Sequence, residues 1–132
     1  MKGLDTNVLL RFFVRDDAKQ ARAAAEFLSK TCTPTDPGFV NLIVLCELVW
    51  TLSRTYGYTR SEIADVVDAM LGNAALVMEA QEAVVGASQR YRETGIDLSD
   101  LLIDDVNRAQ GCLATVTFDR KAAKLDGFQL LT

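Results

Sequence analysis

The sequence predicts an α/β fold in which a mostly parallel sheet of four to five strands is covered by helices on both faces, giving three layers. Short apolar runs alternate along the chain with longer segments whose apolar residues recur at helical spacing. The 132 residues contain two prolines and no linker, repeat or low-complexity tract, so we expect one domain over residues 1–132. Strands that alternate with helices pair in parallel through right-handed connections.

The chain begins with a strand and two helices. Residues 2–4 are long enough only for a short strand, and the apolar spacing of VLLRFF after it predicts a helix over 7–14. The alanine-rich segment AKQARAAAEFL favours a second helix over 17–30, because alanine is the best helix former. The polar turn TPTDPG then separates this helix from the next strand.

The middle of the chain repeats the alternation. GFV predicts a strand over 38–40, and LIVLCELVWTLSRTYG predicts a helix over 42–57 that stops at its terminal glycine. In TRSEIADVVDAMLGN, Thr59 and Glu62 have the spacing of a capping box, and the closing Gly-Asn pair marks the helix end. ALVM predicts the next strand, over 75–78.

The last elements alternate in the same way. Helical spacing followed by a glycine predicts two helices, over 79–94 and 98–110. Two short apolar runs, LATVTF and QLL, predict strands over 113–118 and 129–131.

Composition excludes several kinds of chemistry. The chain has no histidine, which removes Ser-His-Asp and Cys-His catalysis and the usual zinc sites. Three cysteines without CxxC spacing indicate reduced thiols. The net charge of −4 is not typical of a nucleic-acid binder, although clustered arginines can still bind phosphates. No apolar stretch is long enough to span a membrane and the start is no signal peptide, so we expect a cytoplasmic protein.

A carboxylate follows the first strand. Asp5 lies in the predicted strand-to-helix turn, together with Thr6 and Asn7. Open α/β sheets place ligands at such turns. The alternative is that Asp5 or Thr6 only caps the helix by accepting a backbone hydrogen bond.

A second carboxylate, Glu47, lies in the middle of the apolar helix LIVLCELVWTL. An apolar helix of this kind predicts burial, and a buried carboxylate costs several kcal/mol unless it is paired, hydrogen-bonded or bound to metal. Glu47 therefore has either a structural partner such as an arginine or a functional one.

The third group of acids is in GIDLSDLLIDD. Asp97 is the expected cap of the helix, and Asp100 lies in its first turn. Asp104 is four residues later on the same face. A cap and a solvated acidic face explain Asp97, Asp104 and Asp105, but explain Asp100 less well.

A fourth carboxylate, Asp119, directly follows the strand in TVTFDR, as Asp5 follows the first strand. Carboxylates that meet at the edge of a sheet repel one another unless a cation lies between them. Mg²⁺ and Mn²⁺ prefer carboxylate, water and phosphate oxygens. The residues alone therefore indicate an α/β domain with an acidic metal site.

Four motifs in order, LDTNVLLRFF, LCELVWTL, IDLSDLLI and TVTFDRKAAKL, resemble the PIN-domain family, and within it the VapC toxin ribonucleases of VapBC toxin–antitoxin systems. The resemblance extends from Lys2 to Leu131 and implies a PIN-like, Rossmann-like fold. It implies a metal-dependent endoribonuclease that acts on RNA, uses Mg²⁺ or Mn²⁺, forms a homodimer and is inhibited by a cognate antitoxin.

The resemblance also implies a site, residue by residue. The acids that match the family's catalytic metal ligands are Asp5, Glu47, Asp100 and Asp119. The residues expected to orient those ligands are Thr6, Asn7 and Thr117. Those expected to contact substrate phosphates are Arg11, Arg120 and Lys121.

Two acids keep alternative interpretations. Asp104 stands where the family often has a small apolar residue, and it is either an additional acid beside the ligands or, as we favour, an exposed one. Asp97 is either a helix cap or an outer contact of the ligands.

Three other functions compete with a ribonuclease. A catalytically inactive PIN-like module would bind RNA or protein without cleaving it. A haloacid-type phosphatase needs an aspartate at the position of Asn7, and a receiver domain needs a later lysine that QLL does not offer.

Overall fold

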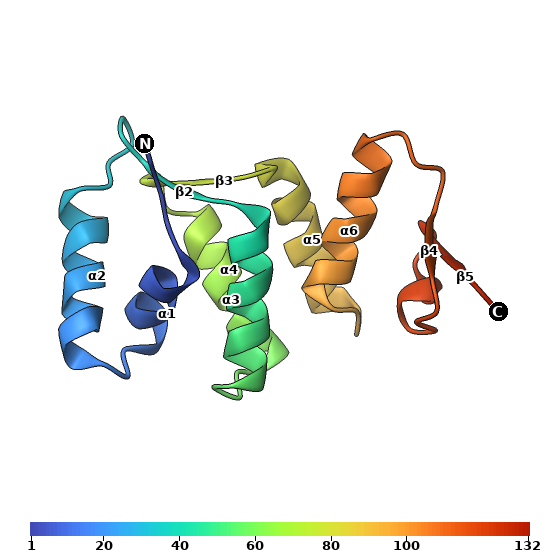
Figure 1. The fold of residues 1–132 in the computed structure, drawn as a ribbon, viewed down its shortest axis with the longest axis horizontal. Helices are drawn as coiled ribbons and strands as arrows, with labels where there is room; N and C mark the ends of the chain where they lie inside the picture. Colours follow the sequence, from blue (N-terminus) through green and yellow to red (C-terminus); the bar gives the residue numbers. More distant parts are fainter. The chain divides into compact units, whose positions relative to one another are not determined.

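The computed structural model describes all 132 residues, and it divides into two compact units, Met1–Gln81 and Glu82–Thr132. Strands and helices alternate along both, and every pair of hydrogen-bonded strands is parallel (Figure 1). The predicted α/β class is confirmed. None of the helices combines the length and apolar character that a membrane crossing requires.

The first unit contains a three-stranded parallel sheet. Its strands are β1 (Lys2–Gly3), β2 (Gly38–Val40) and β3 (Leu76–Met78), in the order β1-β2-β3. Lys2 pairs with Gly38, and Gly38 pairs in turn with Leu76. The central strand β2 is therefore hydrogen-bonded on both sides, and its Val40 is fully buried.

Four helices accompany this sheet: α1 (Thr6–Val14), α2 (Ala18–Lys30), α3 (Leu42–Arg54) and α4 (Arg60–Leu71). In Figure 1, α1 packs against α2 and α3, and α3 packs against α4. Leucines of α1 and α3 and the apolar face of α4 form the core, since Leu9, Leu45, Leu48 and Ile63 are almost completely buried.

Local signals in the sequence set several helix ends. Thr59 and Glu62 form the capping box of α4, with both reciprocal hydrogen bonds present. Helix α3 ends at Arg54, three residues before the predicted stop at Gly57. Gly57 takes a positive φ of 68° in the turn that follows, a conformation that glycine adopts without strain, and Tyr58 N–H donates to the Leu52 carbonyl.

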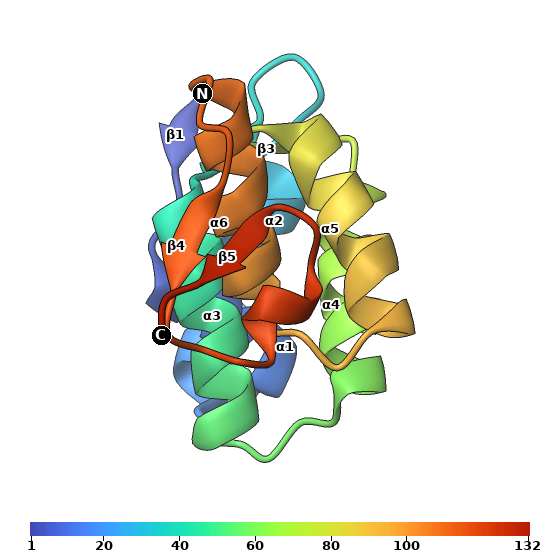
Figure 2. The ribbon, with the colours of Figure 1, turned by 90° about the vertical axis from the view of Figure 1, so that its right-hand side faces the viewer.

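The second unit contains two helices and a small parallel sheet. The helices are α5 (Gln81–Glu93), whose first residue closes the first unit, and α6 (Leu98–Ala109). Strands β4 (Thr115–Thr117) and β5 (Phe128–Leu130) lie side by side, and the short 3₁₀ helix η1 (Ala122–Lys124) connects them (Figure 2). The buried apolar residues of α6 are Leu98, Leu101 and Leu102.

The strands differ from the prediction in one respect. The sequence predicts one sheet of four to five strands, and the structure has five strands in two sheets, of three and of two. Each strand has only two or three residues, so each ladder contains few hydrogen bonds. An apolar run predicts where a short strand lies but not which edge it pairs with.

Candidate metal-binding site

Asp5 lies at the N-terminal end of α1. Its backbone is extended, with a ψ of 157°, and its Oδ1 accepts a hydrogen bond from the Thr6 N–H at 2.9 Å. Asp5 is therefore the N-cap of α1, as one of its two sequence interpretations held. Asp5 is exposed, so its carboxylate remains accessible to a ligand although it caps the helix.

Glu47 lies on the exposed face of α3, where the sequence predicted burial. The correction follows from the helix itself. Val44, Leu45, Leu48 and Leu52 form one buried face, whereas Ile43 and Trp50 are 78% and 61% exposed on the face that carries Glu47. The apolar residues around Glu47 are thus in part surface residues, and no burial cost requires a partner for its charge.

Glu47 nevertheless has a defined partner. The hydroxyl of Thr6 donates a hydrogen bond to Glu47 Oε1, and Thr6 is buried. Because the Thr6 N–H also donates to Asp5, one residue holds both predicted ligands of the first unit. This is the contact expected of a residue that orients ligands. Asn7, the other polar residue of this turn, is exposed.

Asp100 lies in the first turn of α6 and is partly buried. Burial raises its pKa above the ordinary value, and the negative charges of Asp97 and Asp119 raise this pKa further. Asp100 is therefore close enough to Asp97 and Asp119, within the second unit, to be affected by both charges. Asp97 occupies the N-cap position but makes no side-chain capping hydrogen bond.

Asp119 lies two residues beyond β4 and is tied to the turn that follows. Its Oδ1 accepts hydrogen bonds from the Lys121 N–H at 2.8 Å and the Ala122 N–H at 3.3 Å. The Asp119 N–H donates to the Thr117 hydroxyl at 3.0 Å. Thr117 thus contacts the residue that it was predicted to orient, through the backbone of Asp119.

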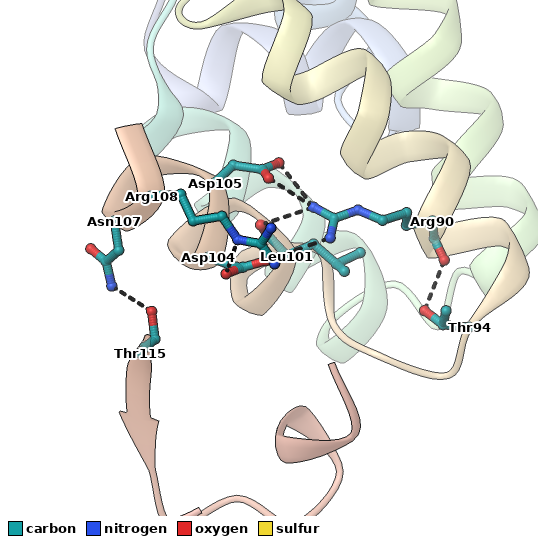
Figure 3. A network of polar contacts seen from close by, with 8 residues as sticks. All are labelled: Arg90, Thr94, Leu101, Asp104, Asp105, Asn107, Arg108 and Thr115. Atoms are coloured by element: carbon teal, nitrogen blue, oxygen red, sulfur yellow. Dashed lines mark hydrogen bonds and ion pairs between the residues drawn. The ribbon is translucent and has the colours of Figure 1, made fainter. Parts of the chain in front are cut away.

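Asp104 is fully buried, which contradicts the prediction of an exposed acid. Its Oδ1 accepts a hydrogen bond from Arg108 Nε at 2.9 Å, and its Oδ2 lies 3.6 Å from a guanidinium nitrogen of Arg90 in α5 (Figure 3). Two arginines therefore lie beside the buried charge, although Oδ2 accepts no hydrogen bond. Asp105, by contrast, is half-buried and accepts two 3.0 Å hydrogen bonds from Arg90.

The three predicted phosphate contacts differ in their surroundings. Arg120 and Lys121 are exposed next to Asp119. Arg11 donates to Gln20 at 2.6 Å and to Asp16 at 3.1 Å, so its charge is already paired. With Asn7, it lines a cavity of about 430 Å³ that α1, α2 and β1 enclose.

Sequence reasoning missed two residues of the second unit. Arg90 contacts both Asp104 and Asp105, yet it precedes them by more than ten residues on another helix, so no local spacing indicates it. Gly127 approaches Asp104 so closely that a Cβ atom there would lie 1.9 Å from Oδ1. A glycine before a short strand was the available signal for such an approach.

The donor chemistry fits a hard divalent cation. All four matched acids are carboxylates, and no histidine is present to favour a softer metal. Neither unit by itself brings together three Cys, Asp or Glu side chains that could hold an ion. Asp5 and Glu47 belong to the first unit, and Asp100 and Asp119 to the second.

Comparison with known proteins defines the class. The PIN domain model matches residues 3–128, almost the whole chain and parts of both units. The protein therefore belongs to the PIN-domain family. The chain is 29% identical over 129 residues to the VapC ribonuclease of Aquifex aeolicus (strain VF5), a match that covers 98% of this chain and 94% of that protein. No solved structure matches it significantly.

Proposed function

We propose that the protein is a metal-dependent endoribonuclease that acts as the toxin of a toxin–antitoxin pair. Its membership of the PIN family and its similarity to a VapC ribonuclease over nearly the full length of both proteins support this activity. One structural observation carries the site assignment. Asp100 is partly buried, and the negative charges of Asp97 and Asp119 further disfavour its ionised form, as expected where carboxylates lie close together.

The ligands in this proposal are Asp5, Glu47, Asp100 and Asp119, which hold Mg²⁺ or Mn²⁺. A bound divalent cation supplies a Lewis acid that polarises the scissile phosphate and lowers the pKa of water. At Asp100, a bound cation would offset both the partial burial of the carboxylate and the charges of its neighbours. Oxygen ligands alone favour these two ions over zinc or copper.

Thr6 and Thr117 orient the ligands. Thr6 contacts Glu47 through its hydroxyl and Asp5 through its N–H, so Glu47 has a defined hydrogen-bond partner although it is exposed. Thr117 anchors the turn that presents Asp119. Asp97 is an outer contact in this account, since its carboxylate acts on Asp100 without capping the helix.

RNA phosphates contact Arg120 and Lys121, which are exposed directly after Asp119. Such contacts position a strand without reading its bases. Arg11 contributes less than the sequence suggested, because Asp16 and Gln20 already occupy its guanidinium group.

The remaining partners of this proposal are a cognate antitoxin, which inhibits the enzyme, and a second copy of the chain in a homodimer. Trp50 is a candidate contact for either, because it is 61% exposed on α3. The cytoplasm, where both RNA and antitoxin occur, is the proposed site of action.

Cleavage of a mixed single-stranded RNA tests the proposal. The purified protein is assayed with Mg²⁺, with Mn²⁺ and with EDTA, beside an Asp5→Asn variant prepared identically. We expect cleavage that requires metal and is absent in the variant. Equal cleavage by both preparations would indicate a contaminating nuclease. If neither cleaves this RNA or folded tRNA, the protein is instead an inactive PIN-like module that binds RNA or protein.

A further inference from the structure

The centre of α6 is fixed by a buried carboxylate. Asp104 accepts a hydrogen bond from Arg108 at 2.9 Å, and its second oxygen is buried without a hydrogen bond, 3.6 Å from Arg90. A carboxylate without full compensation is costly in a core, and an apolar side chain of similar size is often more stable there. Burial of the Asp104 carboxylate therefore lowers the stability of the fold, and packing alone does not explain why an acid is present at this position.

The same residue joins α6 to the segment before β5. The Cα atom of the buried Gly127 is so close that any side chain there would overlap Asp104 Oδ1 and the Arg108 guanidinium group, at 1.9 Å and 2.6 Å. The Gly127 carbonyl accepts a hydrogen bond from the Thr115 N–H at 2.8 Å, at the start of β4. Gly127 therefore links Asp104 to both strands of the small sheet, because it precedes β5 and is hydrogen-bonded to Thr115 at the start of β4.

A second hydrogen bond joins α6 to β4 directly. Asn107 Nδ2 donates to the Thr115 hydroxyl at 2.9 Å (Figure 3). On the opposite side, Arg90 of α5 donates to Asp105 and to the Leu101 carbonyl. Helix α6 is therefore held between α5 and the β4–β5 sheet, and the fully buried Asp104 lies close to Arg90 of α5 and to Gly127, the residue before β5.

The contacts between α6 and β4 lie between two proposed ligands, Asp100 and Asp119, and the charge of Asp119 acts on Asp100. Asp100 is one turn before Asp104 on α6, and Asp119 is two residues beyond the end of β4. A rotation of α6 against β4 would change the separation of Asp100 and Asp119, because Asp100 is on α6 and Asp119 follows the end of β4.

We infer that Asp104, with Arg108 and Gly127, is a positioning group that sets the separation of Asp100 and Asp119 and thereby the affinity of the site for a divalent cation. Asp104 touches neither substrate nor metal in this account. The inference rests on the proposed function, because it assumes that Asp100 and Asp119 are ligands. Outer residues that orient metal ligands typically change metal affinity about 10- to 100-fold when they are replaced.

The test measures Mn²⁺ binding directly, by calorimetric titration of the metal-free protein without RNA. The variants are Asp104→Asn, which keeps the size of the side chain but loses its charge, and Arg108→Gln, which changes a side chain that is about half exposed. Asp105→Asn is the matched control, since it removes an adjacent charge that pairs with the same Arg90 but does not contact Gly127.

We expect Asp104→Asn to weaken Mn²⁺ binding at least tenfold, Arg108→Gln to weaken it in the same direction, and Asp105→Asn to change it less than twofold. Circular dichroism shows whether each variant is folded. If Asp104→Asn does not fold, the Mn²⁺ affinity of Arg108→Gln decides the outcome. Folded variants that bind Mn²⁺ as tightly as the native protein would overturn the inference alone, leaving Asp104 a purely structural residue. A native protein that binds no Mn²⁺ would overturn the proposed metal site, and this inference with it.

Discussion

The buried hydroxyl of Thr6 donates a hydrogen bond to the carboxylate of Glu47, which lies 41 residues later in the chain. This contact joins the first turn of α1 to the middle of α3. Because the Thr6 N–H binds Asp5 as well, a single small residue determines how two of the proposed metal ligands are presented. Two of the proposed ligands in the first unit are therefore held by one residue.

Replacing Thr6 tests this role. Thr6→Val keeps the shape of the buried side chain but removes the hydroxyl, so we expect Mn²⁺ affinity and kcat/KM for RNA to fall about tenfold or more. Thr6→Ser keeps the hydroxyl and retains most of both. Equal loss in the two variants would indicate a packing effect, and no loss in Thr6→Val would remove Thr6 from the site.

Asp100→Asn should stabilise the protein in the absence of metal. The folded-state pKa of Asp100 is raised, first by burial and then by Asp97 and Asp119, so its ionised form destabilises the folded state at neutral pH. Solvent screening limits the gain to below about 1 kcal/mol.

Thermal unfolding in EDTA measures this effect. The variant should have a melting temperature a few degrees above the native one at pH 7. The difference should shrink as the pH falls through the raised pKa of Asp100 and vanish below the ordinary aspartate value, where the carboxyl group is neutral in the folded and the unfolded state. A native protein that is the more stable at pH 7 would contradict the repulsion that defines the acidic cluster.

Gly127→Ala should destabilise the second unit. The new Cβ atom would overlap Asp104 Oδ1 at 1.9 Å, so either the buried carboxylate or the backbone before β5 must move. Overpacking of this kind typically costs about 1–3 kcal/mol. Gly86→Ala is the control, because a Cβ there meets nothing within 4 Å on helix α5, and alanine should stabilise by about 0.5–1 kcal/mol. Denaturant unfolding compares them, and equal effects would contradict the close contact at Gly127.

The two compact units should unfold together. The PIN-domain match includes both, and we therefore keep the prediction that residues 1–132 form one domain. The single tryptophan, Trp50, reports on the first unit, whereas far-ultraviolet circular dichroism reports on the helices of both. Coincident midpoints by the two probes are expected for one domain. A second circular dichroism transition after the Trp50 signal is complete would show two domains.

Local signals made much of the fold predictable. The capping box of α4 needs only Thr59 and Glu62, which are three residues apart, and strand β2 is the apolar run GFV between turn residues. The turns that carry Asp5 and Asp119 were predictable for the same reason, because each acid directly follows a strand predicted from the sequence.

The errors concern contacts between distant residues. Glu47 was expected to be buried because α3 is rich in apolar residues, but sequence alone does not show that Ile43 and Trp50 lie uncovered. Asp104 was expected to be exposed because it lies in an acidic run, but its compensation depends partly on Arg90 from another helix. Burial of a charge is decided by such partners and not by helical spacing.

The most direct test of the proposed ligands is whether Asp5 and Asp119 are each needed for Mn²⁺ binding. Mn²⁺ binding to the metal-free protein is measured by calorimetric titration for the native chain, for Asp5→Asn and for Asp119→Asn. We expect each single substitution to weaken binding at least tenfold, because each acid is a proposed ligand. Loss of binding in only one of the two variants, with the other binding Mn²⁺ as the native protein does, would contradict it.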